Sequence, residues 1–137
     1  MAKIALTWKD GNAFESEHED GVVQIDNPVE GQATRGMRPK ALMLSSLAGC
    51  SALDIVSLLK KMRAEVDDFK IDVTAELTDE HPRIYKDVVV TYKFYGSDFK
   101  KDKIQKAIDL SVERYCGVME MFRGFTDVAI EIEYHEQ

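Results

Sequence analysis

The chain has 137 residues, enough for one hydrophobic core of ordinary size and too few for two. Its 25 acidic residues outnumber its 18 basic residues, and the net charge of −7 argues against nucleic acid or an anionic membrane as a partner. Two cysteines without a visible secretory signal favour a reducing cytoplasmic setting, where a static disulfide would be unusual. The three histidines stand far apart without ligand spacing, so no metal or resident cofactor is expected.

Three short segments near the N-terminus are predicted to form an antiparallel meander. Residues 3–9 (KIALTWK) alternate apolar and polar side chains, which is the period of a half-buried strand. Residues 13–18 and 22–26 are the second and third predicted strands, because turn signals that contain glycine separate the three segments. Residues 27–37 are rich in glycine and polar residues and are predicted to be a loop.

The longest apolar stretch, residues 41–59, is predicted to be a central helix. Pro39 suits the first turn of a helix, where its missing N–H is not needed, and basic residues at the other end complement the helix dipole. Length alone would also fit a membrane span, but Asp54, Gly49 and four serines favour a soluble core helix. Because apolar side chains surround this helix, we expect other elements to cover most of its sides.

Two alternating segments in the second half predict the clearest hairpin of the chain. Residues 69–78 place Phe69 and every second residue up to Leu77 on one face. Residues 86–95 turn a second apolar set inward, namely Val88, Val90, Tyr92 and Phe94.

Helical spacing returns after the hairpin, from about residue 100 to residue 115, with Ser97 and Asp98 as the expected cap. After a break at Cys116, residues 118–123 predict a further helical turn or two. Residues 127–134 (DVAIEIEY) end the chain as an amphipathic strand.

The predicted order is β-β-β-α-β-β-α-β, an α+β fold in one domain over residues 1–137. We expect one six-stranded sheet. Such a sheet and one amphipathic helix cannot cover a central helix that is apolar on nearly every side. A homodimer that packs two copies of this helix together would supply the missing cover, so self-association is expected.

The two thiols, Cys50 in the central helix and Cys116 at the end of the next helix, are 66 positions apart and form no C-x-x-C motif. A lone helical cysteine is usually a small buried hydrophobe, and this remains an alternative for both. Three features favour reactivity. Glycine and serine flank Cys50 and leave room for a substrate, Arg35 and Arg38 precede the helix and could stabilise a thiolate, and Cys116 precedes a glycine at a helix break.

Two motifs resemble those of the OsmC/Ohr superfamily, and the order of predicted elements agrees from end to end. Residues 38–52 (RPKALMLSSLAGCSA) resemble its signature helix, in which a proline precedes a cysteine by about ten positions. Residues 113–118 (ERYCGV) resemble the E-K-Y-C-x-V-like motif around the second cysteine of that family. At Asp54, which follows the first cysteine, the sequence resembles the OsmC-like branch of the family rather than Ohr itself.

The resemblance implies an interlocked homodimer, with two central helices wrapped by sheets and active sites at the interface. It implies reduction of small organic hydroperoxides, with Cys50 as the peroxidatic thiol and Cys116 as the resolving thiol. A sulfenic acid on Cys50 would condense with Cys116 to a disulfide. An external dithiol, which is a lipoyl group in the best-known members, would reduce it again. Arg35 best matches the arginine that OsmC-type members carry before this helix, and Arg38 is the second candidate.

Lys40 departs from the family pattern, because the peroxidases carry a glutamate at this position that orients an arginine over the thiolate. Glu30 or Glu113 would have to replace that glutamate as the partner of Arg35 or Arg38. Lys40 itself is a flexible point charge without the planar geometry of a guanidinium. A catalytically weak or inactive protein that binds a small apolar ligand is therefore the alternative function.

Further residues near the thiols are candidates for a substrate pocket. Methionines would make a pliable wall for a fatty or aromatic hydroperoxide, although filler in an irregular core is the simpler interpretation. Aromatic side chains beside Cys116 could line the same pocket or act as packing anchors. A carboxylate one turn beyond Cys50 should pair with Arg, Lys or backbone, because an unpaired negative charge would disfavour the thiolate. The candidates are Met43, Asp54, Tyr115, Met119 and Phe122.

Overall fold

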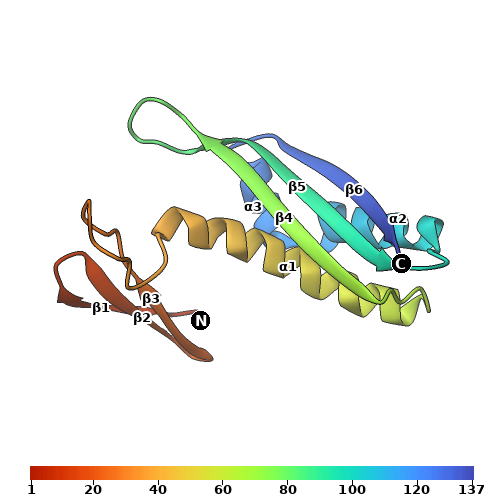
Figure 1. Cartoon of the computed structure of the whole chain (residues 1–137), viewed down its shortest axis with the longest axis horizontal. Coiled ribbons are helices and arrows are strands. Elements are labelled where there is room, and N and C mark those ends of the chain that lie inside the picture. The colour runs from red at the N-terminus through yellow and green to blue at the C-terminus, as the bar shows by residue number, and fades with distance from the viewer. The chain divides into compact units, whose positions relative to one another are not determined.

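The computed structural model describes all residues from Met1 to Gln137. Its contacts divide the chain into two compact units, Met1–Met43 and Leu44–Gln137. The predicted α+β order β-β-β-α-β-β-α-β is confirmed, and in the sequence a long helix follows the first three strands (Figure 1). The strands form two three-stranded sheets, so the prediction of one six-stranded sheet is wrong for a single chain. The third strand pairs with the second and then bridges to Met37, and it forms no ladder with the later strands.

The first unit is the predicted antiparallel meander of β1 (Ala5–Asp10), β2 (Ala13–His18) and β3 (Gly21–Ile25). Its pleat separates two kinds of surface, as the alternation in the sequence requires. On one face, Trp8 lies opposite Phe14 in the register of β1 and β2, and Trp8 is 65% exposed. The sheet therefore carries apolar side chains that nothing in this unit covers completely.

The loop after β3 closes back onto the meander. The Met37 N–H donates to the Gln24 carbonyl at 2.9 Å, and the Asp26 N–H donates to the Met37 carbonyl at 3.1 Å. Gly36 is needed at this approach, because a Cβ there would lie 2.5 Å from the Gln24 carbonyl oxygen. The buried Asp26 carboxylate accepts the Arg35 N–H at 2.9 Å. The predicted loop is confirmed, and its last residues are held against β3.

The long helix α1 (Pro39–Lys61) begins at the predicted proline. Its length and composition fit a membrane span, but its fully buried side chains recur every four residues, as in a core helix. The buried residues are Leu47, Ser51, Ile55 and Leu59. The opposite side is open, and Leu53 is 77% exposed. A single copy therefore does not supply the cover on most sides that the sequence predicts.

Two lysines of the following helix satisfy carbonyl groups at the C-terminal end of α1. Lys100 Nζ donates to the Arg63 carbonyl at 2.8 Å, and Lys103 Nζ donates to the Met62 carbonyl at 2.9 Å. Arg63 has a φ of 55°, the left-handed conformation that commonly ends a helix. These ammonium groups also complement the negative end of the helix dipole.

The second sheet is built from β4 (Asp68–Leu77), β5 (Tyr85–Gly96) and β6 (Val128–Glu136). The central strand β5 is antiparallel to β4 and parallel to β6, so the predicted hairpin is confirmed. Its predicted inward residues are at most 1% exposed: Val88, Val90, Tyr92 and Phe94. These side chains form one core with residues of all three helices, which lie alongside this sheet (Figure 1).

Three helical segments connect β5 to β6: α2 (Lys101–Leu110), the π-helical turn η1 (Ser111–Tyr115) and α3 (Gly117–Arg123). The predicted helix ends near the expected residue, but its last turn is π-helical rather than α-helical. The predicted cap by Ser97 and Asp98 is wrong, because Lys100 is the N-cap and makes no side-chain capping bond. Asp98 has a φ of 53°, so the chain is still turning there.

Candidate functional site

The two cysteines meet in the second unit, although they are 66 positions apart in the sequence. Cys50 lies in the middle of α1 and is half-buried, whereas Cys116 follows η1 and is 3% exposed. The Cys116 thiol lies close enough to Cys50 to interact with it, and both residues are free cysteines. The structure therefore brings together the two residues on which the predicted chemistry depends.

The π-helical turn determines where Cys116 lies. The Cys116 N–H donates to the Ser111 carbonyl at 2.8 Å, five residues back instead of the four of an α-helix. The Val112 carbonyl, which an α-helical Cys116 would use, accepts instead from Arg123 Nη1 at 2.5 Å. Cys116 then becomes the N-cap of α3, and its Sγ accepts the Met119 N–H at 3.3 Å. Such π turns often occur at functional sites because they redirect a side chain.

Burial raises the pKa of the Cys116 thiol to about 11, because its thiolate would lose hydration. The hydrogen bond to Cys50 and the negative charges of Cys50 and Asp54 act in the same direction. The hydrogen bond from the Met119 N–H favours the thiolate but does not outweigh the other causes. At neutral pH Cys116 is therefore a protonated thiol that faces Cys50.

A chain of buried hydroxyl groups lies beside the two sulfurs. Ser51, the residue after Cys50, has its Oγ 2.7 Å from the Tyr92 hydroxyl and 2.8 Å from Ser111 Oγ. Ser111 Oγ donates to Asp54 Oδ2 at 3.0 Å. Ser51, Tyr92 and Ser111 are each 0% exposed, so the bonds are shielded from solvent. The chain joins α1, β5 and η1 through side chains alone.

Asp54 was expected to pair with Arg, Lys or backbone, and this prediction is wrong. Its partner is the Ser111 hydroxyl, which η1 turns toward α1. A neutral donor satisfies the carboxylate without cancelling its charge, and this charge still acts on Cys116.

The arginines predicted to assist Cys50 belong to the first unit. Both terminal guanidinium nitrogens of Arg35 donate to the Asp10 carboxylate, Nη2 at 2.6 Å and Nη1 at 3.2 Å. These hydrogen bonds lower the pKa of Asp10. Arg35 therefore pairs with Asp10 rather than with the expected Glu30 or Glu113. Arg38 is exposed, and its carbonyl accepts the Leu42 N–H at 3.3 Å.

The first turn of α1 contains no acidic residue, and Lys40 within it is exposed. Tyr115 and Met43 are 51% and 44% exposed, so both offer surface to a ligand or a partner. Met119 and Phe122 are 0% and 1% exposed and belong to the hydrophobic core, which favours the packing interpretation for these two. No group of three or more His, Cys, Asp or Glu side chains could hold a metal ion.

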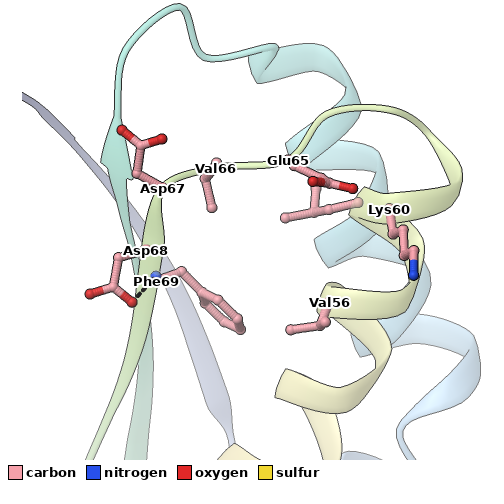
Figure 2. A pocket seen from close by; sticks show the side chains of 8 residues that line it. Val56, Lys60, Glu65, Val66, Asp67, Asp68 and Phe69 are labelled. Carbon is pink, nitrogen blue, oxygen red and sulfur yellow. Dashed lines mark hydrogen bonds between the residues drawn. The ribbon is translucent and has the colours of Figure 1, made fainter.

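A separate hollow of about 490 Å³ opens at the C-terminal end of α1. Figure 2 shows the side chains of Val56, Val66 and Phe69 pointing into it, with Asp67 and Asp68 at its edge. Lys60, which also lines it, is ten residues beyond Cys50, or about 15 Å along the helix at 1.5 Å per residue. This hollow is therefore distinct from the thiol pair.

Sequence reasoning missed Ser51, Tyr92 and Ser111 as parts of the site. Ser111 stands at an apolar position of the helical period, and Tyr92 carries a hydroxyl on an inward face, so both needed a buried partner. This signal could have marked them as polar groups of the core. It could not have paired them, because the π turn that brings Ser111 to Asp54 leaves no local pattern.

Comparison with known proteins identifies the family and the fold of this chain. Residues 31–131 match the family model described as OsmC-like protein. Protein YhfA of Escherichia coli K12 is 30% identical over 128 residues, which are 93% of this chain and 94% of that protein. A hypothetical protein from Aquifex aeolicus has a TM-score of 0.88 at 28% identity, covering 100% of this chain and 98% of its own. The organic hydroperoxide resistance protein OhrB of Bacillus subtilis shares the fold, with a TM-score of 0.68, 22% identity and coverage of 96% and 97%.

Proposed function

Because the chain belongs to the OsmC-like protein family, we propose that it is a thiol-dependent peroxidase that reduces organic hydroperoxides. The observation that carries this proposal is the proximity of Cys50 and Cys116, two free thiols on different elements that interact at the same core. The likeness to a protein of organic hydroperoxide resistance supports the choice of substrate class. Two unbridged cysteines also suit a reducing cytoplasmic compartment.

The reaction needs two steps in the protein and one external reductant. In the first step, the Cys50 thiolate attacks the terminal peroxide oxygen. A sulfur–oxygen bond forms, the oxygen–oxygen bond breaks, and the alkoxide takes a proton to leave as an alcohol. In the second step, Cys116 attacks the sulfur of the Cys50 sulfenic acid. A disulfide forms, and the hydroxyl group leaves with the Cys116 proton as water. A dithiol then reduces the disulfide by exchange.

The surroundings of the two sulfurs support this division of roles. The attacking group must be a thiolate that a substrate can reach. Cys116 is 3% exposed and is kept protonated by its raised pKa of about 11, so it does not suit the first step. Cys50 is half-buried, and a Cβ built on the adjacent Gly49 would meet no atom within 4 Å. The open space at Gly49 gives a hydroperoxide a route to Cys50.

Rapid consumption of cumene hydroperoxide in the presence of dithiothreitol tests the proposal. We expect Cys50→Ser to abolish consumption. We expect Cys116→Ser to permit one oxidation, which leaves a Cys50 sulfenic acid that dimedone can trap. Equal inactivity of wild type and Cys50→Ser with several hydroperoxides and dithiols, lipoyl compounds included, would refute it.

We also propose that the working form is a homodimer with its site at the interface. On α1, Leu53 is 77% exposed, and on the first sheet Trp8 is 65% exposed, so one copy leaves large apolar side chains open on both units. Light scattering after size exclusion should give twice the 15.5 kDa mass of the chain. Leu53→Glu should weaken the dimer, whereas Lys106→Glu on the exposed side of α2 should not. A monomeric wild type would refute the proposal.

The alternative, a protein that binds a small apolar ligand without efficient chemistry, rests on one observation. The first turn of α1 carries Lys40 and no acid, so it cannot orient an arginine over Cys50 as the family peroxidases do. A ligand retained through purification and seen by native mass spectrometry, together with slow peroxide consumption, would favour this alternative. A Lys40→Glu variant that gains peroxidase activity would show that the missing acidic side chain at this position limits the chemistry.

A further inference from the structure

Only one order of donors and acceptors is possible along the hydroxyl chain beside the thiols when Asp54 carries a negative charge. A carboxylate only accepts, so Ser111 must donate its one hydroxyl proton to Asp54. Ser51 must then donate to Ser111, which leaves Tyr92 as the donor to Ser51. Each hydroxyl donates once, Ser51 and Ser111 each accept from the hydroxyl before them, and no buried side-chain nitrogen or oxygen lacks a partner.

Both ends of the thiol pair are tied to this chain. Ser51 is adjacent to Cys50 on α1, so its bond to Ser111 fixes the distance between α1 and η1 beside that sulfur. The carbonyl of Ser111 accepts the Cys116 N–H at 2.8 Å, so the position of Ser111 sets that of Cys116. Tyr92 reaches Ser51 from β5 at 2.7 Å and adds a third element to the junction.

We propose that Tyr92, Ser51, Ser111 and Asp54 act as positioning residues that hold Cys116 against Cys50. This role rests on the proposed function, because it prepares Cys116 for the second step. The hydrogen bonds fix the approach of one sulfur to the other. The carboxylate adds a small contribution to the burial that raises the pKa of Cys116, and the Cys116 proton leaves with the sulfenic hydroxyl as water when the disulfide forms.

Few other charges face Cys116. From α1 come Cys50 and Asp54, and from β5 comes Tyr92, whose burial raises its pKa and keeps it neutral. The charged side chains on the neighbouring helical segments are exposed, and the pair between Arg123 and Glu120 is closed at 2.6 Å. Asp54 is therefore the carboxylate that acts on Cys116, as the last of the causes that raise its pKa, after burial and Cys50.

The first experiment needs no peroxide. The reduced protein is treated with iodoacetamide over pH 7 to 11, and modification of Cys116 is followed by peptide mass spectrometry. We expect Asp54→Asn, which keeps an acceptor for Ser111 but removes the charge, to shift the Cys116 profile to lower pH. The matched control is Asp109→Asn on the exposed side of α2, which should leave the profile unchanged. An unshifted profile in Asp54→Asn would overturn the electrostatic half of the proposal.

The second experiment measures the geometry. After one equivalent of cumene hydroperoxide, Ser111→Ala should form the disulfide roughly tenfold more slowly, the effect of losing about one hydrogen bond. A larger fraction of the Cys50 sulfenic acid should therefore be recovered as its dimedone adduct. Ser111→Thr should restore the rate, and Tyr92→Phe gives a milder variant if Ser111→Ala does not fold. Disulfide formation within twofold of wild type in folded Ser111→Ala and Tyr92→Phe would overturn the positioning role.

The two experiments separate this inference from the proposed function. If no hydroperoxide reacts with wild type, the peroxidase proposal fails, while the alkylation profile still decides whether Asp54 controls Cys116. In the other case, wild type turns over peroxide while Asp54→Asn keeps the wild-type alkylation profile and Ser111→Ala and Tyr92→Phe keep the wild-type rate of disulfide formation. The peroxidase proposal then stands and the positioning role is wrong.

Discussion

The raised pKa of Cys116 predicts a specific loss of stability in alkaline solution. In the unfolded chain this thiol ionises near its ordinary value of 9.0, whereas in the folded protein it ionises at about 11. Between these values the folded state binds more protons than the unfolded state, so the free energy of unfolding falls as pH rises. A difference of this size corresponds to about 3 kcal/mol at 1.36 kcal/mol per pH unit. The contribution is fully present below pH 9 and is lost as the pH rises through about 11.

Urea denaturation of wild type and Cys116→Ser, measured in a phosphine reductant at several values from pH 7.5 to 11, isolates this contribution. Serine is a good N-cap residue, so the variant should keep the bond from the Met119 N–H. Other groups that titrate in this range, Tyr92 among them, affect both proteins and largely cancel in the difference. We expect wild type to lose about 2 kcal/mol relative to Cys116→Ser between pH 8 and pH 11, because half of the folded thiol is still protonated at pH 11.

A Cys50→Ser variant supplies the internal check. Its substitution removes one of the groups that raise the pKa of Cys116, so the alkaline loss should become smaller but not vanish, because burial is the first cause. The reasoning would be refuted if the difference between wild type and Cys116→Ser stayed constant from pH 8 to pH 11. It would also be refuted if wild type gained stability relative to the variant.

Three further substitutions test other parts of the structure. Gly36→Ala places a Cβ against the Gln24 carbonyl and should destabilise the loop by about 1–3 kcal/mol, seen as faster hydrogen exchange at the Met37 amide. Leu47→Ala empties a fully buried position and should lower the free energy of unfolding by about 2–5 kcal/mol in urea. Arg35→Gln breaks an exposed ion pair, which water and salt screen, and should lower stability only slightly in the same urea assay. A larger loss for Arg35→Gln would show that this pair has a structural role.

Local patterns in the sequence predicted most of the fold. The alternation in β5 gave the right inward face, and Val90, Tyr92 and Phe94 are all 0% exposed. The alternation in β4 failed only at Leu77, which follows a register shift of the strand and is 38% exposed. Alternation succeeds because side chains of a strand point to opposite faces whatever its partners are. The number of sheets was not predictable in this way, because alternation does not say which strand edges meet.

The candidate site was predicted only in part, and the reason is again physical. The two cysteines were found because a thiol is chemically distinctive and its motif resembles a known family. The partners of Asp54 and Arg35 were missed, since Ser111 and Asp10 are distant in sequence and polar pairing depends on three-dimensional approach. Short polar residues within apolar periods, such as Ser51, are the signal that deserves more weight in similar sequences.

The contact between the thiols depends on one extra residue in a helical turn. Successive residues of an α-helix are rotated by about 100°, so an α-helical continuation of α2 would turn Cys116 to another direction. The π turn avoids this by bonding the Cys116 N–H to Ser111, and Arg123 takes the Val112 carbonyl that is left without its helical donor. The same turn presents the Ser111 hydroxyl to Asp54. One local deviation from the α-helix therefore places both the second sulfur and the hydroxyl chain that supports it.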